Sequence, residues 1–220
     1  MIMPVAQSGF IHRFLPSPKM EGAATLLLLH GTGGDENDLL DIGRLLAPEA
    51  NLLSPRGRVL ENGMPRFFRR VAEGVFDLQD LKIRTRELAE FTEKSATVHG
   101  FELDRIIAVG YSNGANIAAS LLLLFPRLLA GAILFRPMVP LEPDSLPDLS
   151  DVMVFIASGR HDMIIPPEQP ERLTTILQAA GADVTLRWQD AGHGITSDEI
   201  KAGREWLTAS VKNDHAESNT

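Results

Sequence analysis

The chain contains no cysteine. It therefore cannot form disulfide bonds, thiolate zinc sites or Cys-x-x-Cys redox pairs, and no cysteine can serve as a nucleophile. Any covalent chemistry that the protein performs has to use another side chain.

Basic side chains are scarce relative to acidic ones. The 220 residues include 21 Lys and Arg against 29 Asp and Glu, which gives a formal net charge of -8 at pH 7. An excess of negative charge disfavours binding to nucleic acid phosphates and to acidic membrane surfaces. We expect neither nucleic acid nor a membrane as a partner.

Long hydrophobic runs are absent as well. The longest run, from Ile117 to Phe125, includes Ser120 and is far shorter than the roughly 20 residues that cross a bilayer. The stretch from Met1 to Phe14 lacks the basic start, apolar centre and small-residue cleavage site of a secretory signal. We therefore expect a cytoplasmic protein.

What is present is typical of a folded globular domain. Hydrophobic residues make up 44% of the chain and charged residues 23%, close to the averages for such proteins. The length suits one domain with a substantial core. We predict a single domain over residues 1–211 and a disordered polar tail over residues 212–220.

Short apolar segments alternate with longer amphipathic ones along the chain. The apolar segments predict β-strands at Thr25–Leu29, Asn51–Ser54, Arg105–Val109, Gly131–Phe135, Val152–Ala157 and Asp183–Trp188. The amphipathic segments predict helices at Asn37–Leu46, Asp77–Val98, Asn113–Phe125, Glu168–Ala180 and Ser197–Ser210. Because the strands are apolar on both faces, we predict an α/β fold with a mostly parallel central sheet and helices on both faces.

One motif carries a clear chemical signal. The sequence Gly110-Tyr111-Ser112-Asn113-Gly114 directly follows a predicted strand and opens a predicted helix. In this G-x-S-x-G context the serine stands at the apex of a sharp turn, and the glycines are needed because Cβ atoms would collide there. Ser112 is the candidate nucleophile, and the helix that follows it directs unpaired N–H groups toward a developing oxyanion.

A serine nucleophile needs a base to accept its proton. His193 is the preferred base, because it lies on a glycine-flanked loop directly after the last predicted strand. His161 also follows a predicted strand and is its serious rival. For His30 we favour a structural role in bracing its loop.

The base in turn needs a carboxylate to orient it. Asp162 follows the predicted strand Val152–Ala157, which yields the chain order serine, acid, histidine expected of the α/β-hydrolase arrangement. Asp190 and Asp198 are rivals close to the base in sequence, but a surface turn and a helix N-cap explain them better.

A glycine-rich turn, His30-Gly31-Thr32-Gly33-Gly34, follows the first predicted strand. It matches neither the G-x-G-x-x-G nor the Walker pattern, so a phosphate-binding loop is weakly supported. The better interpretation is an oxyanion hole formed by the backbone N–H groups of Thr32 and Asn113. Such a site supplies nucleophile, base and electrostatic stabiliser from the chain itself, so we expect no metal and no organic cofactor.

Together these motifs make the chain resemble the bacterial phospholipase/carboxylesterase family of α/β-hydrolases, from about Thr25 to Leu207. It is most similar to the branch of hydroquinone-responsive carboxylesterases and more distantly to acyl-protein thioesterases. The resemblance implies small serine esterases without a large cap, with the same triad and oxyanion donors. It also implies that a homodimer is possible.

Two long loops are expected at the rim of the site, Pro55–Gly74 and Pro137–Asp151. They and the segment after Asp162 supply the candidate substrate contacts: an apolar wall of Phe67, Phe68, Met138 and Ile164. Core packing is an equally good explanation for each of these four.

The first of these loops also concentrates positive charge, at Arg56, Arg58, Arg66, Arg69 and Arg70. A solvated face is the ordinary explanation of such a run. The sharper hypothesis is that Arg66 or Arg69 attracts an anionic substrate.

The sequence thus predicts a serine carboxylesterase that cleaves small or medium soluble esters through an acyl-serine intermediate. Two alternatives stay open. One is a thioesterase or peptidase with the same triad, and the other is a non-catalytic binding module that keeps only the fold.

Overall fold

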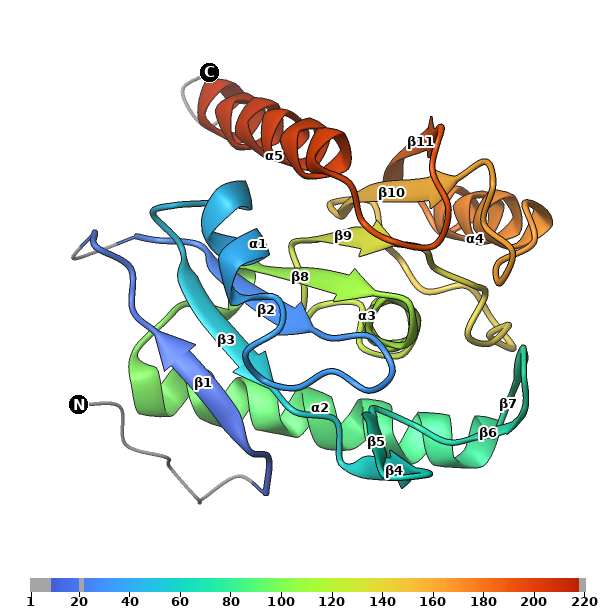
Figure 1. Cartoon of the computed structure of the whole chain (residues 1–220). Coiled ribbons are helices and arrows are strands. Elements are labelled where there is room, and N and C mark those ends of the chain that lie inside the picture. Colours follow the sequence, from blue (N-terminus) through green and yellow to red (C-terminus); the bar gives the residue numbers. More distant parts are fainter. Residues whose placement is uncertain (1–8, 20–21, 218–220) are drawn as a thin grey trace.

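The structure is a computed structural model that describes residues 9–19 and 22–217. The described residues form a seven-stranded sheet with the order β1-β3-β2-β8-β9-β10-β11 (Figure 1). Its strands are β1 (His12–Leu15), β2 (Thr25–Leu29), β3 (Asn51–Pro55), β8 (Ile106–Tyr111), β9 (Gly131–Phe135), β10 (Met153–Gly159) and β11 (Asp183–Gln189). The mostly parallel sheet predicted from the apolar runs is therefore present.

Only the edge strand β1 is antiparallel, and it pairs with β3. All other neighbours in the sheet run parallel. Strand β1 was not predicted from the sequence. Its four residues are all half-buried, so they show neither a continuous apolar run nor a clear alternation.

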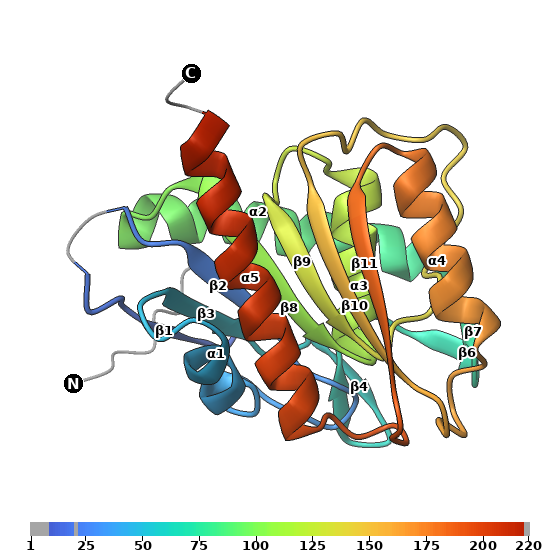
Figure 2. The ribbon, with the colours of Figure 1, turned by 90° about the horizontal axis from the view of Figure 1, so that it is seen from above.

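Helices cover both faces of the sheet, as Figure 2 shows. Helices α1 and α5 lie on one face, and α2, α3 and α4 lie on the other. Their bounds are α1 (Leu40–Leu46), α2 (Leu78–His99), α3 (Asn113–Leu124), α4 (Glu168–Ala179) and α5 (Ser197–Glu217), with a short 3-10 turn at Leu103–Arg105.

Strand β2 shows how one strand serves both layers. Its leucines alternate, so that Leu26 and Leu28 join the core beneath α1 and α5, whereas Leu27 and Leu29 join the core beneath the other three helices. This alternation follows from the two-residue period of a strand. A strand buried on both sides reads as a continuous apolar run, which is why β2 was predictable.

The helix ends differ from the predictions by more than one residue in two places. Helix α1 begins at Leu40, three residues after the expected start at Asn37. Helix α5 continues to Glu217, so residues 212–217 extend the helix where an irregular tail was expected. Residues 218–220 of that expected tail, and residues 1–8 at the other end, lie outside the described part of the chain.

The two long connections differ from each other. The segment predicted as a loop from Pro55 to Gly74 forms a hairpin of β4 (Val59–Glu61) with β5 (Met64–Arg66), followed by a smaller one of β6 (Arg70–Ala72) with β7 (Val75–Phe76). The other connection, residues 137–151, has no regular element. Neither builds a separate layer over the sheet, in agreement with the absence of a large cap domain (Figure 1).

Of the helices that the structure describes, none is both long and apolar enough to cross a membrane.

Helix α3 approaches strand β2 very closely at Gly114. A Cβ added at Gly114 would lie 1.9 Å from the carbonyl oxygen of Leu29, so Gly114→Ala is expected to lower the free energy of unfolding by at least about 2 kcal/mol. Urea denaturation measures this loss.

The matched control is Gly203→Ala in α5, where the added Cβ would meet side-chain atoms alone: the movable Leu46 Cδ2 at 3.1 Å and two Ile133 carbons at an ordinary contact distance of 3.8 Å. It should be nearly neutral, because alanine is also the better helix former. Equal losses of stability in the two variants would contradict the steric account.

Candidate active site

The candidate nucleophile lies in a strained turn between β8 and α3. Ser112 has a φ of 51° and a ψ of -112°, a left-handed region that non-glycine residues rarely occupy. Its N–H donates to the carbonyl of Phe135 at 2.9 Å. The turn is tight because a Cβ at Gly110 would lie 2.5 Å from the Gly114 carbonyl oxygen. Both motif glycines are therefore required by close backbone approach.

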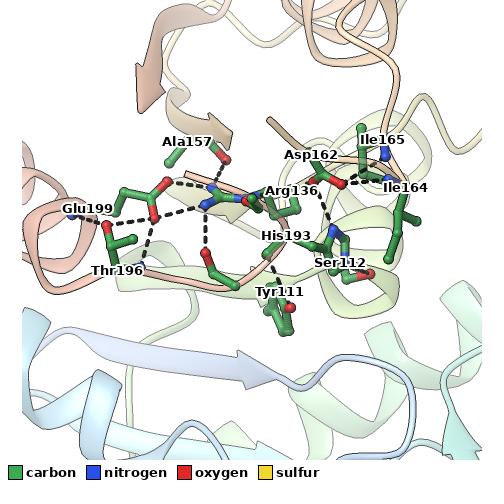
Figure 3. Close-up of polar contacts among 12 residues, drawn as sticks. Tyr111, Ser112, Arg136, Ala157, Asp162, Ile164, Ile165, His193, Thr196 and Glu199 are labelled. Atoms are coloured by element: carbon green, nitrogen blue, oxygen red, sulfur yellow. Dashed lines mark hydrogen bonds and ion pairs between the residues drawn. The ribbon is translucent and has the colours of Figure 1, made fainter. Parts of the chain in front are cut away.

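Three side chains from distant parts of the chain meet at this turn (Figure 3). The His193 Nε2 lies 3.1 Å from the Ser112 Oγ, and the His193 Nδ1 lies 2.8 Å from the Asp162 Oδ2. Parallel strands place their carboxyl ends at one edge of the sheet, and β8, β10 and β11 each deliver one of the three residues there. This is the serine–imidazole–carboxylate arrangement that the sequence predicted.

The Asp162 carboxylate is almost fully shielded from water, with 2% of its side chain exposed. Burial by itself would raise its pKa, but hydrogen bonds from His193 and from the backbone N–H groups of Ile164 and Ile165 outweigh burial and lower the pKa of Asp162. Those N–H groups donate to Oδ1 at 2.8 and 3.1 Å. The group opposite the imidazole is thus a carboxylate near neutral pH.

The two backbone N–H groups predicted to bind an oxyanion belong to Asn113, directly after Ser112, and to Thr32 in the glycine-rich turn. Asn113 is the first residue of α3, where the helix offers no internal acceptor for its N–H. Within the described residues, the N–H groups of Thr32 and Asn113 donate to no carbonyl of the connecting segments. Neither of these two N–H groups is therefore occupied by such a carbonyl.

The strand β5 and the residue after it hold both candidate donors in place. The Pro65 carbonyl accepts from the Gly33 N–H at 2.9 Å, next to Thr32. The Arg66 Nη1 donates to the Thr32 Oγ1 at 2.8 Å, and the Phe67 N–H donates to the Asn113 Oδ1 at 2.8 Å. The first hairpin therefore braces the two sides of the candidate oxyanion hole.

The comparisons with known proteins agree with this geometry. A family model described as Phospholipase/Carboxylesterase matches residues 12–211. The chain belongs to the phospholipase/carboxylesterase family. The family resemblance and the α/β-hydrolase fold expected from the sequence are confirmed.

Several members of this family are close relatives. The putative hydrolase MhqD of Bacillus subtilis is 53% identical over 186 residues, which cover 84% of this chain and 93% of MhqD. The crystal structure of the Bacillus cereus carboxylesterase has 46% identity and a TM-score of 0.90, over 94% of this chain and 96% of that one. A carboxylesterase from Mesorhizobium loti has 35% identity and a TM-score of 0.88, over 94% and 98% of the two chains. Two of these three relatives are described as carboxylesterases and the third as a putative hydrolase, which supports ester hydrolysis.

The rival base and acids lie outside this site. The His161 Nε2 lies 2.6 Å from the Asp190 Oδ1, and both side chains are exposed to solvent. Asp198 is exposed in the first turn of α5. Neither His161 nor these two aspartates contacts Ser112.

The predicted apolar wall is half wrong. Phe67 and Phe68 belong to the core: their exposed fractions are 2% and 0%, and the ring of Phe67 packs against His30 while that of Phe68 packs against Phe76. Both residues lie in the short link between the two hairpins, and this link packs its side chains into the core. Met138 is half-buried and Ile164 is half-exposed next to Asp162, so these two remain candidate contacts.

The arginines of the first hairpin region are not free cations. Each has at least one carboxylate within ion-pair distance: Arg56 has Asp35 and Glu36, Arg58 has Glu87, Arg66 and Arg70 share Glu61, and Arg69 has Asp77 and Asp80. Arg66 is buried and braces Thr32. Because the positive charge is neutralised locally, the structure lends no support to attraction of an anionic substrate by Arg66 or Arg69.

Three residues near the base escaped the sequence analysis. The Tyr111 hydroxyl donates to the His193 carbonyl at 3.2 Å, and the buried pair of Arg136 and Glu199 lies behind the same loop. Only Glu199 had a readable signal, because Thr196-x-x-Glu199 is a capping-box pattern. In the described part of the chain, no three His, Asp or Glu side chains lie close enough to share a metal ion.

His30 has the predicted bracing role. Its Nε2 accepts from the Gly57 N–H at 2.9 Å, so its Nδ1 carries the proton and donates to the Gly31 carbonyl at 2.6 Å. Burial lowers the pKa of His30 below 6.5, and the hydrogen bond to Gly31 only partly offsets this effect. The folded protein therefore needs a neutral imidazole at this position.

This lowered pKa predicts an acid-sensitive contribution to stability. The unfolded chain binds a proton at His30 below pH 6.5 but the folded chain resists it, so stability is full above that pH and falls below it, by at most about 1.4 kcal/mol per pH unit. His30→Gln should be less stable at pH 7.5, yet lose less stability by pH 5.5. Urea denaturation at both values measures this, with the exposed His161→Gln as control. A pH dependence identical to that of the unaltered protein would contradict the account.

Proposed function

We propose that this protein is a serine carboxylesterase that hydrolyses small or medium soluble carboxylic esters through an acyl-Ser112 intermediate. One observation carries the proposal: the continuous contact from the Ser112 Oγ through the His193 imidazole to the Asp162 carboxylate. The carboxylesterases among the relatives support the choice of ester as the substrate class.

In the first half-reaction His193 accepts the Ser112 hydroxyl proton while Oγ forms a bond to the ester carbonyl carbon. The carbonyl electron pair moves onto oxygen, where the Thr32 and Asn113 N–H groups stabilise it. Collapse of this intermediate breaks the bond to the alcohol, which leaves with the proton held by the imidazolium. Asp162 stabilises the imidazolium charge and holds the ring with Nδ1 protonated.

In the second half-reaction water repeats the same steps. His193 accepts a proton from water as its oxygen attacks the acyl carbon. The second tetrahedral intermediate then expels the Ser112 Oγ, which regains the proton from the imidazolium. The carboxylic acid departs and the free enzyme is restored, with water consumed as the second substrate.

The rim of the site favours soluble substrates over lipid aggregates. The connections over the sheet edge are two small hairpins and one irregular segment, and His193 keeps 21% of its side chain exposed. Met138 and Ile164 offer a limited apolar contact for an acyl or aromatic group. A short soluble ester fits this surface better than a long lipid chain that needs a deep tunnel.

The nucleophile assignment predicts that Ser112→Ala lowers kcat by roughly 10⁴-fold or more. It should also abolish covalent labelling by a fluorophosphonate. Ser120→Ala is the matched control, because Ser120 lies in the same helix and its hydroxyl only donates to the Asn116 carbonyl. Labelling that survives in Ser112→Ala would reject the proposal, and a protein that neither labels nor turns over esters would be a binding module.

The substrate class predicts an order of rates. kcat/KM for short p-nitrophenyl esters should exceed that for acyl thioesters of equal chain length, and emulsified triglyceride should be the poorest substrate. A panel that varies acyl length and leaving group measures this order. Faster cleavage of thioesters would point instead to a thioesterase with the same triad.

A further inference from the structure

The loop that carries His193, residues 190–196 between β11 and α5, is held at three consecutive carbonyls. The Arg136 Nε donates to the Gly192 carbonyl at 2.9 Å, and the Arg136 Nη2 donates to that of Gly194 at 2.7 Å. Between them, the Tyr111 hydroxyl donates to the carbonyl of His193 itself. Such a loop has no freedom to shift along its own axis while these donors stay in place.

Both donors stand at the ends of neighbouring strands. Tyr111 ends β8, and it pairs with Phe135 at the end of β9, directly before Arg136. Arg136 has a left-handed φ of 56°, and its N–H donates to the Ala157 carbonyl at 2.9 Å. Figure 3 shows the Arg136 side chain between Glu199 on one side and His193 on the other.

Arg136 is fully buried and uses all its donors. Its Nε has one N–H, which binds Gly192, and its two Nη atoms have four, which bind the carbonyls of Ala157 and Gly194 and both oxygens of Glu199. Only a planar guanidinium offers five N–H groups in this arrangement. A lysine could keep the charge but not these contacts.

Glu199 couples the same pair to the start of α5. Its Oε2 accepts from the Thr196 N–H at 2.8 Å, and its own N–H donates to the Thr196 Oγ1 at 3.3 Å, which is a reciprocal capping box. The carboxylate is as fully buried as its arginine partner. One side chain therefore caps the helix, ends the His193 loop and balances the charge of Arg136.

The charge of Arg136 also lies close to the triad. Its Nε is 3.9 Å from the Asp162 Oδ2. The charged and titratable groups around His193 are thus Asp162, Tyr111 and the pair of Arg136 and Glu199. Replacing a buried ion pair by apolar residues often leaves stability unchanged or raises it, so stability alone does not account for a buried pair at this place.

We infer that Arg136 and Glu199 are positioning residues for the base: Arg136 fixes the His193 loop at the distance that proton transfer from Ser112 requires, and Glu199 balances the arginine charge beside Asp162. The inference rests on the proposed function, because it gives His193 the role of base. It assigns two separable effects, one of geometry to Arg136 and one of charge to Glu199.

The geometric effect is tested with Arg136→Lys, which keeps the charge and loses most of the carbonyl contacts. kcat should fall by about 100-fold, as expected for a displacement of about 1 Å at a reacting group, whereas KM changes little. Rates are expressed per folded molecule, with the folded fraction taken from urea denaturation. The control Leu173→Ala removes a buried core side chain of α4 and should lower stability without changing kcat per folded molecule.

The charge effect is tested with Glu199→Gln, which leaves the buried guanidinium uncompensated. A nearby positive charge disfavours the imidazolium, so the His193 resonance should titrate at lower pH in NMR, by about one unit. The acid limb of the kcat/KM profile should move by the same amount. In Arg136→Lys, which keeps both charges, neither should move. Glu142→Gln, which breaks the exposed pair with Arg172, is the matched control.

Three results decide the matter. A loss of kcat in Arg136→Lys with a downward His193 titration in Glu199→Gln supports the inference. Wild-type kcat per folded molecule in Arg136→Lys, or an unshifted His193 titration in Glu199→Gln, overturns the corresponding half. The NMR titration needs no turnover, so it stays decisive even where the unaltered protein fails to label with a fluorophosphonate and the proposed function itself is wrong.

Discussion

The left-handed backbone at Ser112 is the constraint on which the rest of the site depends. A residue in that conformation is strained, and it persists here because α3 starts almost in contact with β2, where Gly114 faces the Leu29 carbonyl oxygen. The same approach sets the N-terminus of α3 beside the glycine-rich turn that contains Thr32. One tight turn therefore exposes the hydroxyl and brings the two candidate oxyanion donors together.

Polar contacts between residues far apart in the chain fix the loops that the sheet brings together. Parallel strands deliver Ser112, Asp162 and His193 to one edge, but a sheet edge alone does not fix a loop to a few tenths of an ångström. The first hairpin braces the oxyanion side through Pro65 and Arg66. The half-buried Tyr111 at the end of β8 and the buried Arg136 after β9 hold the loop on the imidazole side. In this protein the long connections and buried charges act as supports around an open site.

The sequence was most informative where local chemistry alone determines structure. The apolar strands, the G-x-S-x-G turn, the order of the three site residues and the bracing role of His30 could all be predicted, because each follows from a short pattern. Phe68 could not be assigned to the core, since the burial of a residue in the link between the hairpins depends on where that link packs against the rest of the protein.

The ion pairs of the arginines could not be predicted from the sequence either. A run of arginines in the sequence predicts a positively charged surface. The structure shows that carboxylate partners such as Glu61 and Glu87 neutralise this charge. The burial of Arg136 was not readable from the sequence, because an arginine after an apolar strand is ordinarily exposed. Charge and burial that depend on residues far apart in the chain are decided by tertiary contacts.

The central claim, that Ser112 is acylated during turnover, is tested most directly by rapid acid quenching followed by peptide mass spectrometry. With a slowly deacylating ester such as p-nitrophenyl pivalate, the account predicts a transient mass increase of one acyl group on the peptide that contains Ser112. Turnover with no acylated peptide at any quench time, or with the acyl group on another residue, would contradict it.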